Sequence, residues 1–283
     1  MTTWTPLVNW ASDRVGGIHH DETARNKGFP AGLVPGDVHV SMLTAAIVDR
    51  VGPAWYERGW LRMTFVAPAF TGDEARVEVE GDATRSDHVE LTLLRRDGRV
   101  IAAAHAGVDT ANAPARPPWE RSDLPSPTEQ YGDPLPHEPV GTPYPDALET
   151  ITRADVDHSI DGIDPTPWYR TDGPNGPDEP GSPESPWGGP IVPTVAIFNA
   201  IHRTRATPMP KEIGRAMRAG MNARFDAVHH GPMRLDTPYL RRAHLAEKGI
   251  RGRYASRTVE LCYEEPETGV VLFRGRWRIK WVM

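Results

Sequence analysis

One segment of the sequence, the stretch that opens at Gly36 and runs to position 51, is apolar on almost every face of the helix that it favours. Six of the seven residues from Met42 to Val48 are apolar, so this helix has nearly no polar side. A helix of this kind is stable only when other elements cover it on most sides. The rest of the chain must therefore wrap around it.

Short alternating runs follow this helix. Apolar residues recur at every second position in four runs between residues 61 and 108, and turn sequences at 71–73 and 97–98 separate them. A period of two, broken by Gly and Asp, is typical of antiparallel strands joined by turns. The first part of the chain is predicted to be one buried helix and several strands.

The same order of elements occurs a second time. A loop at residues 164–169 precedes a turn, an apolar helix at 195–201 and further strands, including 254–263. Between the two parts, residues 113–148 are rich in Pro and lack apolar periodicity, as expected of an extended linker on the surface. We predict a pseudo-duplicated α+β chain with halves at 1–112 and 149–283, each a sheet wrapped around one helix.

Composition excludes several function classes. The 32 basic and 38 acidic residues give a formal charge of −6, so no wide positive field can attract nucleic acid or an anionic membrane. No leader sequence and no apolar run of about 20 residues is recognisable, and a cytoplasmic location is predicted. The single cysteine, Cys262, rules out an intramolecular disulfide and a cysteine-based metal site, and no metal is expected.

The chemistry-bearing residues gather before and at the start of the first apolar helix. Asp13 and His19 lie six positions apart in a loop, and Gly36 and Asp37 open the helix. An acid and an imidazole can transfer protons, and a helix amino terminus attracts negative charge. This combination predicts an active site in the first half.

These residues also carry a family resemblance. The matching segments are Ile18-His19-His20-Asp21-Glu22-Thr23-Ala24, Gly28-Phe29-Pro30, Leu33-Val34-Pro35-Gly36, Phe65-Val66-Ala67-Pro68 and Thr71-Gly72-Asp73. They resemble the hydratase motif of MaoC-like hotdog proteins, the family of (R)-specific enoyl-CoA hydratases and 3-hydroxyacyl-thioester dehydratases. The resemblance covers the first half well and the second half as a faint repeat, which is the arrangement of double-hotdog members. It therefore implies an α+β double hotdog with a pseudo-dimeric core.

The resemblance implies roles for three residues. His19 matches the motif histidine, Gly36 matches the glycine whose backbone N–H points at the thioester carbonyl, and Asp13 is the candidate for the motif aspartate. Here five residues separate Asp13 from His19 where the family has four, and Gly16-Gly17 replaces the usual Asn-Pro pair. Two glycines can restore the geometry, because glycine accepts backbone conformations that other residues do not.

Further residues are expected to contact the substrate. Pro35, Asp37 and Val38 lie beside Gly36 at the helix start. In the second half, Asp164 keeps the four-residue spacing but Tyr169 stands where the histidine belongs. A tyrosine with a pKa of about 10 is a poor proton acceptor near neutrality, so the second half is interpreted as a partner that completes the substrate tunnel. Chemistry carried by Asp164 and Tyr169 themselves is the alternative.

The predicted function is a hydro-lyase that adds or removes water on a 2-enoyl or 3-hydroxyacyl thioester, as in fatty acid metabolism. The substrate would be carried by CoA or an acyl-carrier protein, and no cofactor is needed. Two alternatives remain open: a hotdog acyl-CoA thioesterase, and a non-catalytic acyl-thioester-binding protein or a repurposed, pathway-specific enzyme. The sequence leaves open the acyl chain, the carrier, the physiological direction and the formation of a homodimer.

Overall fold

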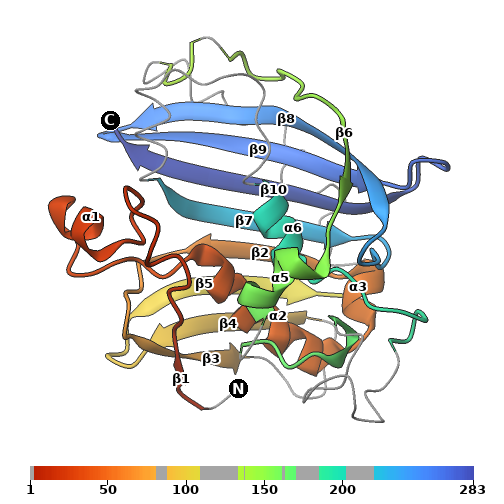
Figure 1. The fold of residues 1–283 in the computed structure, drawn as a ribbon, viewed down its shortest axis with the longest axis horizontal. Helices are drawn as coiled ribbons and strands as arrows, with labels where there is room; N and C mark the ends of the chain where they lie inside the picture. Colours follow the sequence, from red (N-terminus) through yellow and green to blue (C-terminus); the bar gives the residue numbers. More distant parts are fainter. Residues whose placement is uncertain are drawn as a thin grey trace.

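The computed structural model describes residues 3–80, 88–108, 133–136, 138–160, 163–169, 185–201 and 220–283 (Figure 1). Its helices are α1 (Asp21–Asn26), α2 (Gly36–Val51), α3 (Ala54–Arg58), α5 (Arg153–Ile160), the 3-10 helix η1 (Pro167–Tyr169) and α6 (Thr194–Ile201). Its strands are β1 (Thr5–Pro6), β2 (Trp60–Phe65), β3 (Glu74–Glu80), β4 (His88–Arg95), β5 (Val100–Gly107), β6 (Ala147–Thr150), β7 (Met221–His229), β8 (Pro238–Arg251), β9 (Tyr254–Glu264) and β10 (Val271–Val282).

The strands form one antiparallel sheet in the order β1-β3-β4-β5-β2-β7-β10-β9-β8-β6. The first five strands in this order belong to the first half of the chain and the last five to the second half. The halves meet where β2 pairs with β7, with Leu61 opposite Ala227 and Met63 opposite Phe225. The two predicted sheets are thus joined into one, because each supplies the backbone partners that the other's edge strand would lack.

The central helices α2 and α6 lie against one face of this sheet and pack against each other at the junction of the halves, and α5 packs on both of them (Figure 1). Every residue of α2 from Asp37 to Val48 is buried, and all of α6 except Asn199 is buried. The prediction that the apolar helix is wrapped by the rest of the chain is confirmed. Among the described helices, none is long and apolar enough to cross a membrane.

The predicted linker is described only in its second part, since residues 109–132 lie outside the described residues. From position 138 the chain runs beside β8, where the N–H groups of Gly141 and Tyr144 donate to the carbonyls of Leu245 and Ala243, each at 2.8 Å. Tyr144 is buried, so this part of the linker docks on the second half.

Candidate active site

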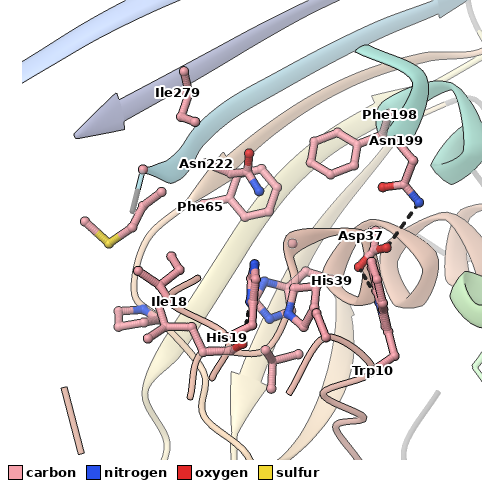
Figure 2. A pocket seen from close by; sticks show the side chains of 18 of the residues that line it. Trp10, Ile18, His19, Asp37, His39, Phe65, Phe198, Asn199, Asn222 and Ile279 are labelled. Atoms are coloured by element: carbon pink, nitrogen blue, oxygen red, sulfur yellow. Dashed lines mark hydrogen bonds between the residues drawn. The ribbon is translucent and has the colours of Figure 1, made fainter. Parts of the chain in front are cut away.

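A cavity of about 510 Å³ opens where the two halves meet (Figure 2). The first half contributes the loop around His19, the start of α2 and the end of β2. The second half contributes residues from α6, β7 and β10, among them Phe198, Asn199 and Asn222. The second half was predicted to complete the substrate cavity, and its residues do form one wall of this cavity.

Hydrogen bonds to both the ring and the backbone carbonyl hold His19 in place. Its Nδ1 atom lies 2.7 Å from the carbonyl oxygen of Leu33, and Asn9 donates to the carbonyl of His19 at 2.9 Å. Because a carbonyl can only accept, Nδ1 carries the proton and Nε2 of the neutral ring has the free lone pair. Burial lowers the pKa of His19, while the Leu33 bond and the negative charge of Asp37 partly oppose this shift. His19 is therefore neutral at pH 7 and can act as a base.

Gly36 is the first residue of α2 and lines the cavity. Its backbone N–H has no acceptor among the described residues, as expected at a helix start, where the helix dipole also favours negative charge. A Cβ on Gly36 would lie under 3.0 Å from Nδ2 of Asn222 and 3.1 Å from Cε1 of Phe65. A larger residue here would require the Asn222 side chain to move. Of its neighbours, Pro35 lines the cavity, whereas Val38 is buried and does not.

Asp37 supplies a fixed negative charge at the cavity wall. It is 1% exposed, and its carboxylate accepts from the Trp10 indole and the Asn199 amide, each at 3.1 Å, and from the N–H of Val38 at 2.8 Å. Figure 2 shows Trp10 and Asn199 approaching it from the two halves of the chain. These donors hold the carboxylate in place, so its charge acts on the neighbouring imidazoles in a constant geometry.

His39 lies in the first part of α2 and also lines the cavity. Burial lowers its pKa to about 4, so it is neutral at pH 7. Its ring is packed near that of Phe65, with centroids 6.1 Å apart, and neither ring nitrogen has a hydrogen bond within the described part of the chain. His39 is a buried wall residue close to the His19 site.

Asp13 does not lie in this cavity. Its side chain is exposed, and it is not among the lining residues, although Ala11 and Arg14 on either side are. The loop makes tight turns here: Val15 N–H donates to the Asp13 carbonyl at 2.9 Å, and Gly16 has a φ of +87°. The two glycines therefore do not bring Asp13 to His19, and the acid beside His19 in the structure is Asp37.

Asp164 and Tyr169 also lie away from the cavity. Both are buried, at 1% and 0% exposure, and neither lines it. The Tyr169 hydroxyl is hydrogen-bonded to the hydroxyl of Tyr56, and burial raises the pKa of both phenols, with Asp164 adding to the shift. The expectation that Asp164 and Tyr169 contact a substrate in this cavity is not met.

Aromatic residues fill the second-half counterpart of the site. Thr194 stands at the start of α6, where Gly36 stands in α2, and its hydroxyl oxygen lies 3.1 Å from the Trp55 indole nitrogen and 3.0 Å from Nε2 of His229. The rings of Trp55 and Tyr56, from α3 of the first half, each lie 5.2 Å from that of His229. This position is therefore part of the core.

The described residues include one group able to bind a metal ion. His88, Glu90 and His105 on β4 and β5 can each place a ligand atom within 4.8 Å of the others. Glu90 and His105 are exposed, and none of the three lines the cavity.

Sequence reasoning missed two polar residues of the cavity wall, Asn199 and Asn222. Each is a single asparagine without a motif around it, and each comes from the second half, far along the chain from His19. Asn199 is the one residue of α6 that is not fully buried, and a polar residue within an apolar helix was the available signal. For Asn222 the sequence holds no comparable signal.

Comparisons with known proteins support the fold. Neither a protein-family model nor a curated protein sequence matches this chain. A crystal structure from Chloroflexus aurantiacus, named a MaoC domain protein dehydratase, is similar with a TM-score of 0.59 and 13% identity, over 99% of this chain and 93% of that one. A Lactobacillus plantarum protein named an oleoyl thioesterase gives 0.52 and 10%, over 99% and 96%.

A third similar structure, from Mycobacterium tuberculosis, is described as having a double hotdog fold. It gives a TM-score of 0.51 and 10% identity, over 96% of this chain and 89% of that one. The predicted α+β double hotdog is confirmed. At these identities the similarity concerns the fold, and neighbours named for dehydration and for thioester hydrolysis share it.

Proposed function

We propose that this chain is a hydro-lyase that adds water to a 2-enoyl thioester or removes it from a 3-hydroxyacyl thioester. One observation carries the proposal: a neutral His19 with a free Nε2 and the unpaired N–H of Gly36 border the same cavity. A base for water and a donor for the thioester oxygen are the two groups that this reaction needs.

In the hydration direction, Nε2 of His19 takes a proton from water as the oxygen bonds to C3. The electron pair of the double bond moves toward the thioester, whose oxygen gains negative charge as an enolate. The N–H of Gly36 stabilises this oxygen, and one such donor is typically worth about 3 kcal/mol. Protonated His19 then gives its proton to C2, which restores the carbonyl and leaves His19 neutral.

The carboxylate that assists His19 in this mechanism is Asp37, not Asp13. Its negative charge favours protonated His19, which exists only between the two proton transfers. Its oxygens are already occupied by Trp10, Asn199 and Val38, so its role is electrostatic. Asp13 takes no part, because its exposed side chain lies outside the cavity.

The proposed substrate is a thioester of CoA or of an acyl-carrier protein. Both carriers bring phosphate groups, and two cationic residues, Arg14 and Lys280, border the cavity from opposite halves of the chain. The interior of the cavity, with Phe65 and Phe198, offers apolar surface to an acyl group. Cationic residues at the border and apolar rings within suit a charged carrier with an acyl tail.

A thioesterase is the second candidate, because the same fold includes a neighbour named an oleoyl thioesterase. In that reaction the water activated by His19 would attack the thioester carbon itself, and free thiol would leave. The same base and the same oxygen donor would serve both reactions, so product analysis must separate them.

The test is the absorbance of crotonyl-CoA in the presence of the purified protein, with thiol release measured in parallel. We expect loss of the enoyl absorbance without thiol release. His19→Ala should lower this rate by about 10²- to 10⁴-fold, the usual contribution of a general acid–base. Asp13→Ala is the matched control in the same loop and should stay close to wild type. Thiol release would support the thioesterase, and binding without turnover a non-catalytic protein.

A further inference from the structure

We infer that Asn222 is a catalytic residue supplied by the second half, whose amide N–H donates to the thioester oxygen together with the N–H of Gly36. The inference rests on the proposed function, since the oxygen in question belongs to a thioester substrate. It extends that function, because the two N–H donors that polarise the carbonyl then come from different halves of the chain.

A bulge in β7 turns Asn222 toward the cavity. Along the pairing of β7 with β10, Phe225 faces Trp277 and Arg224 faces Arg278, but the next residue of β10, Ile279, faces Asn222. Ala223 is thus the extra residue of β7. In a regular strand Asn222 would share the face of Arg224, whereas the bulge puts it on the inner face with Phe225.

A hydrogen bond fixes the orientation of the amide. The indole N–H of Trp277 donates to Oδ1 of Asn222 at 2.7 Å. Because the oxygen is held by this donor, the NH₂ group must point the other way. Nδ2 is the atom that a Cβ on Gly36 would approach to under 3.0 Å. The only side-chain hydrogen bond of Asn222 among the described residues is the one that Oδ1 accepts, so Nδ2 donates to no acceptor there. A free amide donor therefore lies directly over Gly36 at the cavity wall.

The position suits the charge that the reaction creates. When the oxygen of water bonds to C3, the electrons of the double bond shift so that the thioester oxygen becomes an enolate. It returns to a carbonyl when C2 takes the proton from His19. Two donors held in place by the fold, one from Gly36 and one from Asn222, stabilise this oxygen without having to reorganise. Loss of one such donor typically lowers kcat by about 10²- to 10³-fold.

The experiment uses acetoacetyl-CoA, which loses a C2 proton to give an enolate that absorbs in the near ultraviolet, and which needs no hydration step. Asn222→Asp keeps the size and the oxygen that accepts from Trp277 but removes the N–H donors. Asn222→Ala removes the donors without adding a charge. Trp277→Phe removes the group that orients the amide. Trp281→Phe is the matched control, because it lies on the same strand and its indole makes no hydrogen bond in the described residues.

We expect wild-type protein to raise the enolate fraction of bound probe above that of free probe at the same pH. Both Asn222 variants should lower the ionisation constant of the bound probe at least tenfold, Trp277→Phe should lower it less, and Trp281→Phe should match wild type. Calorimetric titration verifies that each variant binds the probe. A wild-type enolate fraction in Asn222→Asp or Asn222→Ala, or no enolate gain in wild type, would overturn the inference.

The two proposals fail separately. Enolate stabilisation that depends on Asn222, without loss of enoyl absorbance from crotonyl-CoA, would uphold Asn222 and refute the hydro-lyase. Hydration at the wild-type rate in Asn222→Ala would uphold the hydro-lyase and refute the role of Asn222. A purely structural role would lower the free energy of unfolding but leave kcat per folded molecule unchanged.

Discussion

Replacing Gly36 with Ala tests how closely the start of α2 approaches its neighbours. The new methyl group would lie under 3.0 Å from Nδ2 of Asn222 and 3.1 Å from Cε1 of Phe65, so the Asn222 side chain must move. Overpacking of this kind costs about 1–3 kcal/mol, whereas Ala is favoured over Gly in a helix by about 1 kcal/mol. We expect the free energy of unfolding to fall by about 0–2 kcal/mol and kcat by about 10²-fold, because the methyl group also blocks the carbonyl from the N–H.

The measurements are urea unfolding and crotonyl-CoA turnover on Gly36→Ala, Asn222→Ala and the double variant. In the double variant the methyl group has room, so stability should recover to that of Asn222→Ala alone. The coupling energy then equals the cost of Gly36→Ala by itself, about 0–2 kcal/mol. Activity should not recover, since the second donor is then absent. Wild-type kcat and wild-type stability in Gly36→Ala would refute the close approach.

Further predictions concern charge and pH. The rate should fall as the pH drops through the lowered pKa of His19, because only the neutral ring accepts a proton. Asp37→Asn removes a charge that raises this pKa, so it should shift the pH–rate profile to lower pH. Asp13→Asn should leave the pH–rate profile unchanged. An unchanged profile in Asp37→Asn would contradict the electrostatic role. Burial lowers the pKa of His39 to about 4 and that of His229 to about 3. Below about pH 6.5 the unfolded chain therefore binds more protons than the folded chain, and the free energy of unfolding must decrease as the pH is lowered. At pH 4 the loss is about 3 kcal/mol for each histidine. Urea unfolding at several pH values checks this, and His39→Phe should flatten the slope.

The sequence was sufficient for the elements with a strong local pattern. The helix α2 and the strands β2 to β5 follow from the placement of apolar residues alone. A strand buried on one face has an apolar residue at every second position, and a helix buried on nearly all faces has a nearly continuous apolar run. The strand β7 was not predicted, since the bulge at Ala223 interrupts its alternation. The strand β8 was missed because long polar side chains, such as Arg241 and Lys248, interrupt its apolar pattern.

The candidate site was predictable in part for the same reason. His19 and Gly36 stand within one continuous segment, and the structure brings both to the cavity. The exposure of Asp13 depends on successive turns in its loop, which residue spacing alone does not determine. The approach of Asn199 and Asn222 depends on how the halves dock, a long-range property that has no local signature.

The most direct test of the central claim is hydration in water enriched with oxygen-18, followed by mass spectrometry of the intact products. Hydration at this site predicts one oxygen-18 atom in the acyl group of a thioester that remains whole, with no such product from His19→Ala. Oxygen-18 in a free carboxylate, together with released thiol, would contradict the hydro-lyase and assign the same base and donor to thioester hydrolysis.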